Sequence, residues 1–280
     1  MSVIPIHHLQ HDANLNLNIA PFQIGHRYEA NTADVHRDDH YIFFLFERGT
    51  ATLTIDFQQV FFQESCVFYI LPGQVHHRLY NQQAQGWYLA VDTGLVPSEF
   101  RAIFEGYLGV QQPLYLDQRL VQQCTTLLQL IWDRSQGEAP FQSNITLTLF
   151  QSLAGIIAEG YRLLTNDMTL TTKPRQLTYA FRKLVIQQFR SLKSPSHYAD
   201  QLNVSVNYLN EVSKKTTGFT ASYWINQQLL LEAKRLLIYS RLDIKEIAYN
   251  LGYADPVYFS KWFKKHASIS PLSFRVKNVE

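Results

Sequence analysis

The chain has 280 residues, of which 46% are hydrophobic and 17% charged, so it is long enough for two globular domains with real cores. It holds no run of the ~20 apolar residues that a membrane-spanning helix needs, and its first ten residues show no secretory signal. The two cysteines, Cys66 and Cys124, lie in apolar surroundings and predict buried thiols instead of a disulfide framework. We therefore expect a cytoplasmic protein with no membrane partner.

The formal net charge of +2 conceals an uneven distribution of charge along the chain. Residues 173–280 hold 17 lysines and arginines against 7 acidic residues, a net charge of +10. Residues 1–172 hold 8 arginines, no lysine and 16 acidic residues, a net charge of −8. This asymmetry favours a polyanionic partner for the C-terminal part, although a solvated basic face has the same composition.

The first part of the chain has the pattern of a small β-sandwich or barrel. The segment "ATLTIDF" at 51–57 alternates apolar and polar residues, as a half-buried strand does. We interpret "ERGT" at 47–50 as a hairpin turn and "LPGQ" at 71–74 as a type II turn. Further strands are predicted for the aromatic and branched runs at 41–46, 66–70 and 87–91.

The hydrophobic period becomes helical after Pro97. A short helix is expected over 98–108, and two long amphipathic helices over 116–135 and 144–164. Two arrangements stay open for the long helices. They pair and leave an apolar face for a dimer, or both simply pack on the β-domain.

A polar, threonine-rich stretch follows the second long helix. We take residues 166–174 as a linker. It separates a domain at 1–165, which holds the predicted strands and the two long helices, from a helical domain at 175–280.

Two segments of the helical domain resemble each other. The segment "SVNYLNEVSKKTTGFT" (205–220) aligns without gaps with "DPVYFSKWFKKHASIS" (255–270), and each follows a short helical pattern. Their first residues, Ser205 and Asp255, are N-cap types. Each segment, together with the short helical pattern before it, therefore predicts a helix, a tight turn and a second helix.

The turns and faces of these pairs fit a helix-turn-helix. Asn203 and Gly252 stand in the turns, where residues that tolerate positive φ are favoured. In the later helix, Phe259 and Phe263 fall on one side by helical spacing, with polar and basic residues on the other. The Leu-rich segment between the pairs, 220–240, would span ~27 Å over about 18 helical residues. Such a rod could hold two recognition helices about one DNA turn, ~34 Å, apart.

At these residues the chain resembles the AraC/XylS family of bacterial transcription regulators. The stretch 232–275, which begins "EAKRLLIYSRLDIKEIAYNLGY", is similar to the family signature along nearly its whole length, and 198–218 is similar to its first helix-turn-helix. The segments "HRDDHYIFFLFERGTATLTI" (36–55) and "LPGQVHH" (71–77) resemble the cupin-type sensor domain of many members. The resemblance implies that residues 1–165 form an effector-binding and dimerisation domain, a cupin-like β-barrel (jelly roll) with two long helices. It further implies a C-terminal all-α domain with two helix-turn-helix units joined by a linker helix.

The resemblance also implies a function. We expect a sequence-specific transcription regulator that is controlled by a small-molecule effector in the barrel and has no enzymatic activity and no cofactor. The expected partners are double-stranded DNA, RNA polymerase, the effector and a second copy of the chain in a homodimer. The alternative is a cupin metalloenzyme with an accessory helical domain.

The resemblance assigns DNA contacts to both recognition helices. Glu211 stands where an arginine is frequent, and Ser213 replaces the aromatic residue matched by Phe263. Ser268 stands where glycine commonly ends the second recognition helix. The base-facing positions fall on Val206, Asn207, Asn210, Glu211, Val257, Ser260 and Lys261, and the phosphate contacts on Lys214, Lys215, Lys264 and Lys265.

The β-domain holds several histidines. His36, His40, His76 and His77 sit at places where metal-binding cupins carry ligands, and imidazoles with a carboxylate suit Fe, Mn or Zn. No clear His-x-His pair and no suitably spaced glutamate accompany them, so we expect no metal. The histidines then line a pocket or lie on the surface. The residues assigned to the effector pocket are His36, Tyr41, His76 and Trp87.

Overall fold

The chain forms two compact units, one of Pro5–Met168 and one of Thr169–Glu280 together with Met1–Ile4. Most of the linker predicted at 166–174 lies outside the described residues. No helix in the part of the chain that is described is long and apolar enough to cross a membrane. The computed structural model describes residues 4–9, 15–22, 35–106, 111–137, 140–164 and 172–279, with the backbone alone at 78–83 and 278–279.

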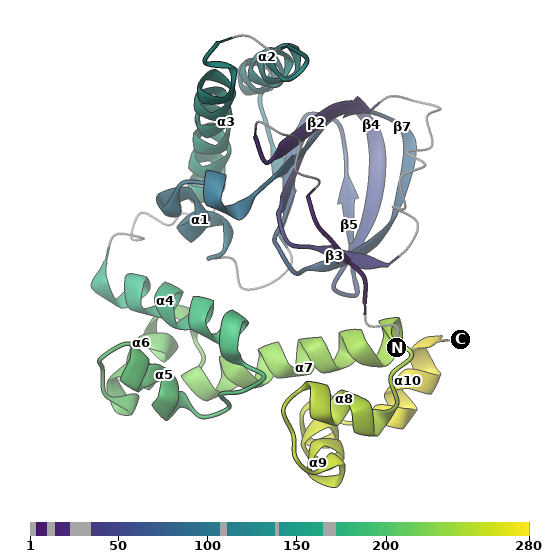
Figure 1. Ribbon diagram of the computed structural model, residues 1–280, viewed down its shortest axis with the longest axis vertical. Coiled ribbons are helices and arrows are strands. Elements are labelled where there is room, and N and C mark those ends of the chain that lie inside the picture. The colour runs from purple at the N-terminus through teal and green to yellow at the C-terminus, as the bar shows by residue number, and fades with distance from the viewer. Residues whose placement is uncertain are drawn as a thin grey trace. The chain divides into compact units, whose positions relative to one another are not determined.

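The N-terminal unit is built on one sheet that curves round on itself (Figure 1). Its strand order is β1-β3-β7-β4-β6-β8, with β2 paired to β7 and β5 paired to β4. The β1–β3 pair is parallel and the other pairs are antiparallel. The strands are β1 Ile6–His7, β2 Leu17–Phe22, β3 His36–Asp38, β4 Tyr41–Ile55, β5 Gln58–Phe62, β6 Cys66–Ile70, β7 Val75–Val91 and β8 Leu114–Tyr115.

The hairpin turn predicted at 47–50 is wrong, because β4 runs through it as one strand. The pairing of β4 with β7 shifts register twice in this stretch, and Gly49 has a φ of 78°. These are the marks of β-bulges, which bend a strand without reversing it. The chain reverses later, at Asp56 and Phe57, whose φ values of 46° and 72° suit a type I′ turn into β5. The turn predicted at 71–74 is present, with a φ of 80° at Gly73.

The sheet buries both of its faces, so neighbouring residues of one strand enter different cores. Phe44 belongs to a cluster made of strand residues such as Phe46, Phe62 and Phe68. Phe43 belongs to a second cluster that combines strand residues with residues of three helices. The first cluster fills the inside of the curved sheet, and the second joins its outside to the helices.

The helices of this unit pack on the outside of the sheet (Figure 1). They are η1 Thr93–Leu95, α1 Ser98–Phe104, α2 Gln118–Ser135 and α3 Gln142–Leu164. The two long helices match their predicted ranges to within two residues at each end, and they pack on each other as well as on the sheet. Phe104, Cys124 and Phe150 are each at most 1% exposed in the shared core.

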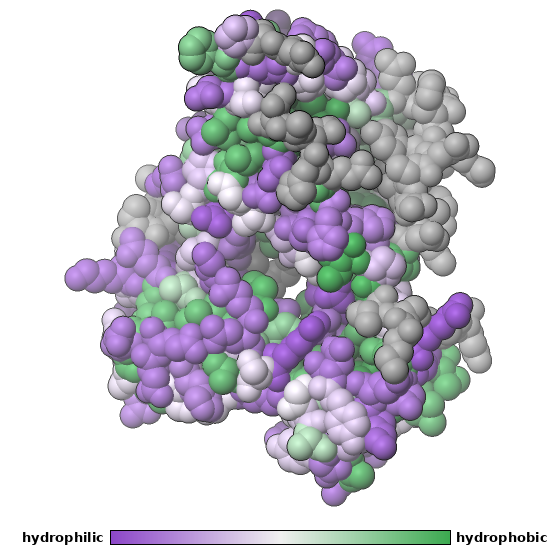
Figure 2. All heavy atoms as spheres, in the orientation of Figure 1, coloured by the Kyte–Doolittle hydropathy of each residue, from purple (hydrophilic) through white to green (hydrophobic). Residues whose placement is uncertain are grey.

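The C-terminal unit is all helical. Its second and third helices, and its fifth and sixth, form the two predicted helix-turn-helix pairs. Figure 2 shows mostly hydrophilic residues on the visible face of this unit, with small hydrophobic patches between them. The helices are α4 Lys173–Gln188, α5 Pro195–Gln201, α6 Val206–Thr217, α7 Ala221–Tyr239, α8 Ile244–Asn250, α9 Pro256–Ala267 and α10 Pro271–Val279.

The long helix α7 connects the two pairs, with α5 and α6 near one end and α8 and α9 near the other (Figure 1). Its 19 residues correspond to a rod of ~28 Å. Nine of its residues are buried, including the charged Glu232 and Arg235. A helix this deeply packed on its neighbours acts as a stiff connection.

A buried carboxylate holds the middle of α7. Glu232 is 1% exposed, and its Oε1 accepts a hydrogen bond of 2.9 Å from Nη2 of Arg190, which follows α4. Its Oε2 accepts one of 3.2 Å from Nη1 of Arg235, itself 4% exposed. The two guanidinium groups supply the donors that a buried carboxylate needs.

The loop between α4 and α5 reaches the turn of the second pair. The ammonium group of Lys193 donates hydrogen bonds of 2.8 Å to the carbonyl oxygens of both Arg190 and Gly252, and it lies 4.8 Å from the ring centre of Tyr253. Gly252 has a φ of 74°, and a side chain there would put its Cβ 1.9 Å from the Arg190 carbonyl oxygen. The close approach therefore requires glycine.

Replacing Glu232 with alanine should lower the free energy of unfolding by ~3–5 kcal/mol, because it removes the buried carboxylate that both Arg190 and the buried Arg235 contact. Urea unfolding of the chain would measure the loss. Asp200→Ala, which removes an exposed carboxylate of α5, is the control and should change stability by less than about 0.5 kcal/mol. Equal curves for the two variants would contradict the role given to Glu232.

Gly252→Ala should destabilise the protein more than Gly218→Ala. Both glycines have positive φ, 74° and 82°, so both variants lose ~1–2 kcal/mol from the left-handed conformation. A Cβ at Gly218 meets nothing within 4 Å, whereas at Gly252 it collides with a backbone carbonyl. Urea unfolding of both variants measures the two losses of stability, and the difference between them is the contribution of the collision. Equal losses would mean that the α4–α5 loop does not constrain the second turn.

Candidate nucleic-acid interface

Each helix-turn-helix pair is fixed by its turn and by the cap of its second helix. The turns contain Asn203 with a φ of 53° and Gly252 with a φ of 74°, as the sequence predicts. The Ser205 hydroxyl accepts the backbone N–H of Tyr208 at 3.1 Å, and the Asp255 carboxylate accepts that of Val257 at 2.8 Å. These caps satisfy backbone donors at the starts of α6 and α9 and fix where each helix begins.

The two recognition helices bury matched positions. Leu209 of α6 and Phe259 of α9 are both fully buried, and so are Ser213 and Phe263. The aromatic rings of α9 contact each other and the ring of Tyr253. The buried face therefore packs each helix against the rest of the C-terminal unit, and the opposite face of each helix points to the solvent.

The outward face of α6 carries the predicted base-facing residues. Asn207 and Glu211 are exposed, and Val206 and Asn210 are half-buried. The Asn210 side-chain oxygen accepts the backbone N–H of Ala221 at 3.1 Å, so it helps to cap the start of α7. This contact leaves the amide nitrogen of Asn210 as the group that can still donate outward.

The outward face of α9 repeats this arrangement. Val257 and Lys261 are exposed, and Ser260 is half-buried like Asn210, its counterpart in α6. The Ser260 hydroxyl donates to the Pro256 carbonyl oxygen at 2.9 Å. In each helix one predicted residue is thus held by a hydrogen bond within the protein, and two are exposed.

The predicted phosphate contacts lie in the last turns of the two helices. Lys214, Lys215, Lys264 and Lys265 are all exposed. Cations at this place also stabilise a helix through its dipole, so their position alone does not assign them to phosphate. Their charge adds to the net charge of +10 on residues 173–280.

The departures from the family pattern are accommodated locally. Ser213, which replaces an aromatic residue, is fully buried and donates to the Phe219 carbonyl oxygen at 2.8 Å. Ser268, which replaces glycine, ends α9 with a φ of 66°, close to the 82° of Gly218 at the end of α6. The two helices therefore end in the same left-handed conformation with different residues.

Sequence reasoning assigned no role to one pair of exposed side chains. Tyr208 and Tyr258 occupy equivalent positions of α6 and α9, and they are 45% and 61% exposed. An exposed tyrosine offers a hydroxyl donor and an apolar ring at the same surface as the predicted contacts. The alignment of segment 205–220 with segment 255–270 pairs these two tyrosines, and this repeat is the signal in the sequence that could have identified them.

The residues predicted for the effector pocket lie in two different places. His36 of β3 and His76 of β7 are directly paired across the sheet, and their rings lie 4.4 Å apart. Tyr41 and Trp87 belong to the core between the sheet and the helices α1–α3, where they are 0% and 6% exposed. The structure therefore brings the two histidines together but not the two aromatic residues with them.

Comparisons with known proteins agree with this division of the chain. A family model described as an AraC-like ligand binding domain matches residues 22–165, just over half of the chain, and a helix-turn-helix domain model matches residues 198–277. The HTH-type transcriptional activator RhaR of Escherichia coli (strain K12) is 28% identical over 149 residues, which cover 52% of this chain and 51% of RhaR. The Msm operon regulatory protein of Streptococcus mutans is 29% identical over 127 residues, 45% of each chain.

The chain thus spans about half the length of the curated relatives it matches. Among solved structures, ToxT from Vibrio cholerae O395 is 13% identical and aligns over 95% of this chain and 98% of that one, with a TM-score of 0.42. The family model that covers the N-terminal part and the helix-turn-helix model that covers the C-terminal part both fit the architecture described above. The chain belongs to the AraC family of transcription regulators, with an AraC-like ligand binding domain followed by a helix-turn-helix domain.

Proposed function

We propose that the chain is a sequence-specific DNA-binding transcription regulator controlled by a small-molecule effector. The observation that carries this proposal is the repeat of one arrangement in α6 and α9. Each helix buries an apolar face and presents matched polar positions outward, with two lysines in its last turn. The major groove of B-DNA is wide enough to admit such a helix.

The outward residues divide into two proposed roles. The base-facing set offers hydrogen-bonding groups at Asn207, Asn210, Glu211, Ser260 and Lys261, which can read base edges in the groove. Val206 and Val257 add apolar contact of the kind that suits a thymine methyl group. The lysine pairs at the helix ends contact phosphates, which position the protein without reading the sequence.

The effector belongs to the N-terminal unit. The match to an AraC-like ligand binding domain supports this assignment. The inside of the curved sheet is filled by aromatic and aliphatic side chains, including Phe44, Phe46, Phe62 and Phe68. An effector that enters this space has to displace some of them, which would couple binding to a change in packing.

Two further partners are proposed on the same basis. Dimerisation is assigned to α2 and α3, which keep apolar side chains exposed after packing on the sheet. Leu130, Leu163 and Leu164 are 43%, 69% and 52% exposed. RNA polymerase is proposed because the relatives RhaR and the Msm operon protein are named as an activator and an operon regulator. Their names give no support to the alternative of a metalloenzyme.

Lys261→Ala and Lys264→Ala should affect DNA binding in different ways. At a bound genomic site identified by footprinting, Lys261→Ala should cost ~1–3 kcal/mol and relax base preference, because its ammonium group faces the bases. Lys264→Ala should weaken binding to all duplexes alike and reduce the slope of affinity against salt by about one. Titrations at several salt concentrations, with the bound site and with random DNA, measure both effects. An equal loss for Lys261→Ala on random DNA would contradict its base-facing role.

Replacing Leu163 and Leu164 together with glutamate should shift the chain from dimer to monomer, because two charges would enter the proposed interface. Sedimentation over a range of protein concentrations measures the shift. Ile186→Glu, at an exposed apolar residue of α4, is the control and should leave the dimer intact. A wild-type chain that sediments as a monomer at high concentration would remove this part of the proposal.

A further inference from the structure

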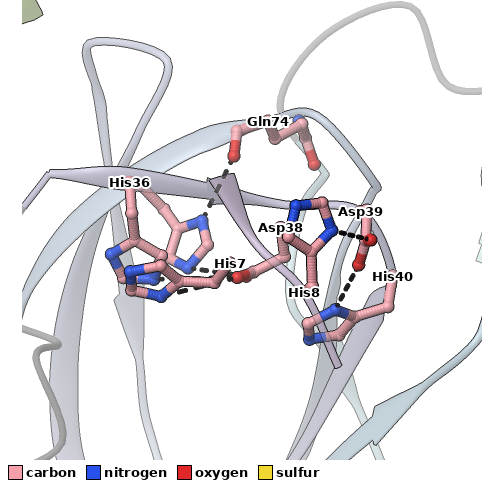
Figure 3. Close-up of polar contacts among 8 residues, drawn as sticks. His7, His8, His36, Asp38, Asp39, His40 and Gln74 are labelled. Atoms are coloured by element: carbon pink, nitrogen blue, oxygen red, sulfur yellow. Dashed lines mark hydrogen bonds and ion pairs between the residues drawn. The ribbon is translucent and has the colours of Figure 1, made fainter. Parts of the chain in front are cut away.

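Three neighbouring strands of the sheet bring four potential metal ligands together. His36 and Asp38 share one face of β3, since side chains alternate along a strand. His76 of β7 is the cross-strand partner of His36, and His7 of β1 is the partner of Asp38. Figure 3 shows the side chains of His7, His36 and Asp38 turned toward one another.

The distances between these groups suit a single ion. Oδ1 of Asp38 lies 4.0 Å from Nδ1 of His7 and 3.9 Å from Nε2 of His36. Its Oδ2 lies 3.3 Å from Nε2 of His76. Ligands at ~2.1 Å from a tetrahedral Zn²⁺ are about 3.4 Å apart, so the contacts of Asp38 with His7 and His36 have to shorten by about half an ångström. Potential ligand atoms of His7, His36 and Asp38 all lie within 4.8 Å of one another, and His76 adjoins this group through Oδ2 of Asp38.

The cluster contains two acceptors that face each other. Nδ1 of His76 is 3.2 Å from the Gln74 carbonyl oxygen, which can only accept, so the ring proton sits on Nδ1. The lone pair of Nε2 then points toward Oδ2 of Asp38, which is buried and has no hydrogen-bond donor among the described residues. Two lone pairs at 3.3 Å repel each other unless a proton or a cation lies between them.

Burial disfavours the charged forms of both His76 and Asp38. Burial, together with the neighbouring histidines, lowers the pKa of His76 to about 3, so its ring is neutral near pH 7. Burial raises the pKa of the Asp38 carboxyl, and the positive charges of His40, His36 and His7 oppose that rise. The neutral His76 ring has a lone pair to offer an ion, whereas the Asp38 carboxyl has to be deprotonated to bind one.

We propose that His7, His36, Asp38 and His76 bind one divalent transition-metal ion. Three imidazoles and one carboxylate suit Zn²⁺, Fe²⁺, Co²⁺ or Ni²⁺, whereas Mg²⁺ and Ca²⁺ prefer oxygen ligands throughout. The Gln74 carbonyl orients the His76 ring from behind, as outer contacts of metal-binding histidines usually do. The inference is independent of DNA binding and of the effector, and it replaces the expectation from sequence that the barrel binds no metal.

A second group of histidines lies beside the site and provides the control. His8 and His40 both contact the carboxylate of Asp39, at 2.6 Å and 3.0 Å (Figure 3). His8 is the chain neighbour of His7, but its side chain is 73% exposed and lies outside the cluster. His7 and His8 therefore form a matched pair of histidines in one short segment.

The test titrates the full chain, freed of metal by a chelator, with CoCl₂ and follows the visible absorption of Co²⁺ and the heat of binding. One Co²⁺ should bind per chain. His36→Ala and Asp38→Asn should weaken binding by at least about 100-fold, and His7→Ala by at least about 10-fold. His8→Ala should bind like the wild type. MgCl₂ should not displace the Co²⁺, whereas ZnCl₂ should.

His7→Ala keeps the test decisive if the variants of buried residues fail to fold, because the His7 side chain is 39% exposed on a two-residue strand. Melting curves of each variant without metal check the fold. A wild-type chain with no saturable Co²⁺ binding would overturn the proposal. So would equal Co²⁺ affinities for His7→Ala and His8→Ala, or displacement of Co²⁺ by Mg²⁺.

Discussion

The buried carboxylate of Glu232 is the contact on which the geometry of the helical unit depends. A charge at 1% exposure is tolerated only with full compensation, and the compensation comes from Arg190 after α4 and from Arg235 in α7. The Arg190 contact places the α4–α5 loop against α7. From there the Arg190 carbonyl oxygen and Lys193 reach Gly252, in the turn before α9. The ion pairs of Glu232 and the hydrogen bonds of Lys193 thus join the α4–α5 loop, the connecting helix and the second turn.

Much of this unit was predictable because its signals are local. The caps at Ser205 and Asp255, the positive φ at Asn203 and Gly252, and the extent of α7 all follow from residue types and helical period. The contacts that join the elements were not predictable in this way. Asn210 has the spacing of an outward residue, yet it bonds to the start of α7, because the position of α7 depends on packing far along the chain.

The β-unit shows the limit of local reasoning more clearly. The turn expected at 47–50 was read from glycine and charged residues, but cross-strand pairing with β7 keeps the strand going and turns the same residues into bulges. His7 could not be linked to His36 by spacing, since only the parallel pairing of β1 with β3 brings them together. Tyr41 and Trp87 were grouped with the histidines by type, although strand alternation puts them in the helix-packed core.

The connecting helix has a consequence for the nucleic acid itself. The packed sides of this ~28 Å rod resist flexing, so the separation of the two recognition helices stays constant whether or not it equals the ~34 Å repeat of straight B-DNA. If both recognition helices enter successive grooves of one duplex, the duplex has to absorb any mismatch between that separation and its own repeat by bending. Curvature of a short site costs ~1–6 kcal/mol and is cheapest at pliable pyrimidine–purine steps. The base pairs between the two grooves would then influence affinity through their stiffness, without touching any side chain.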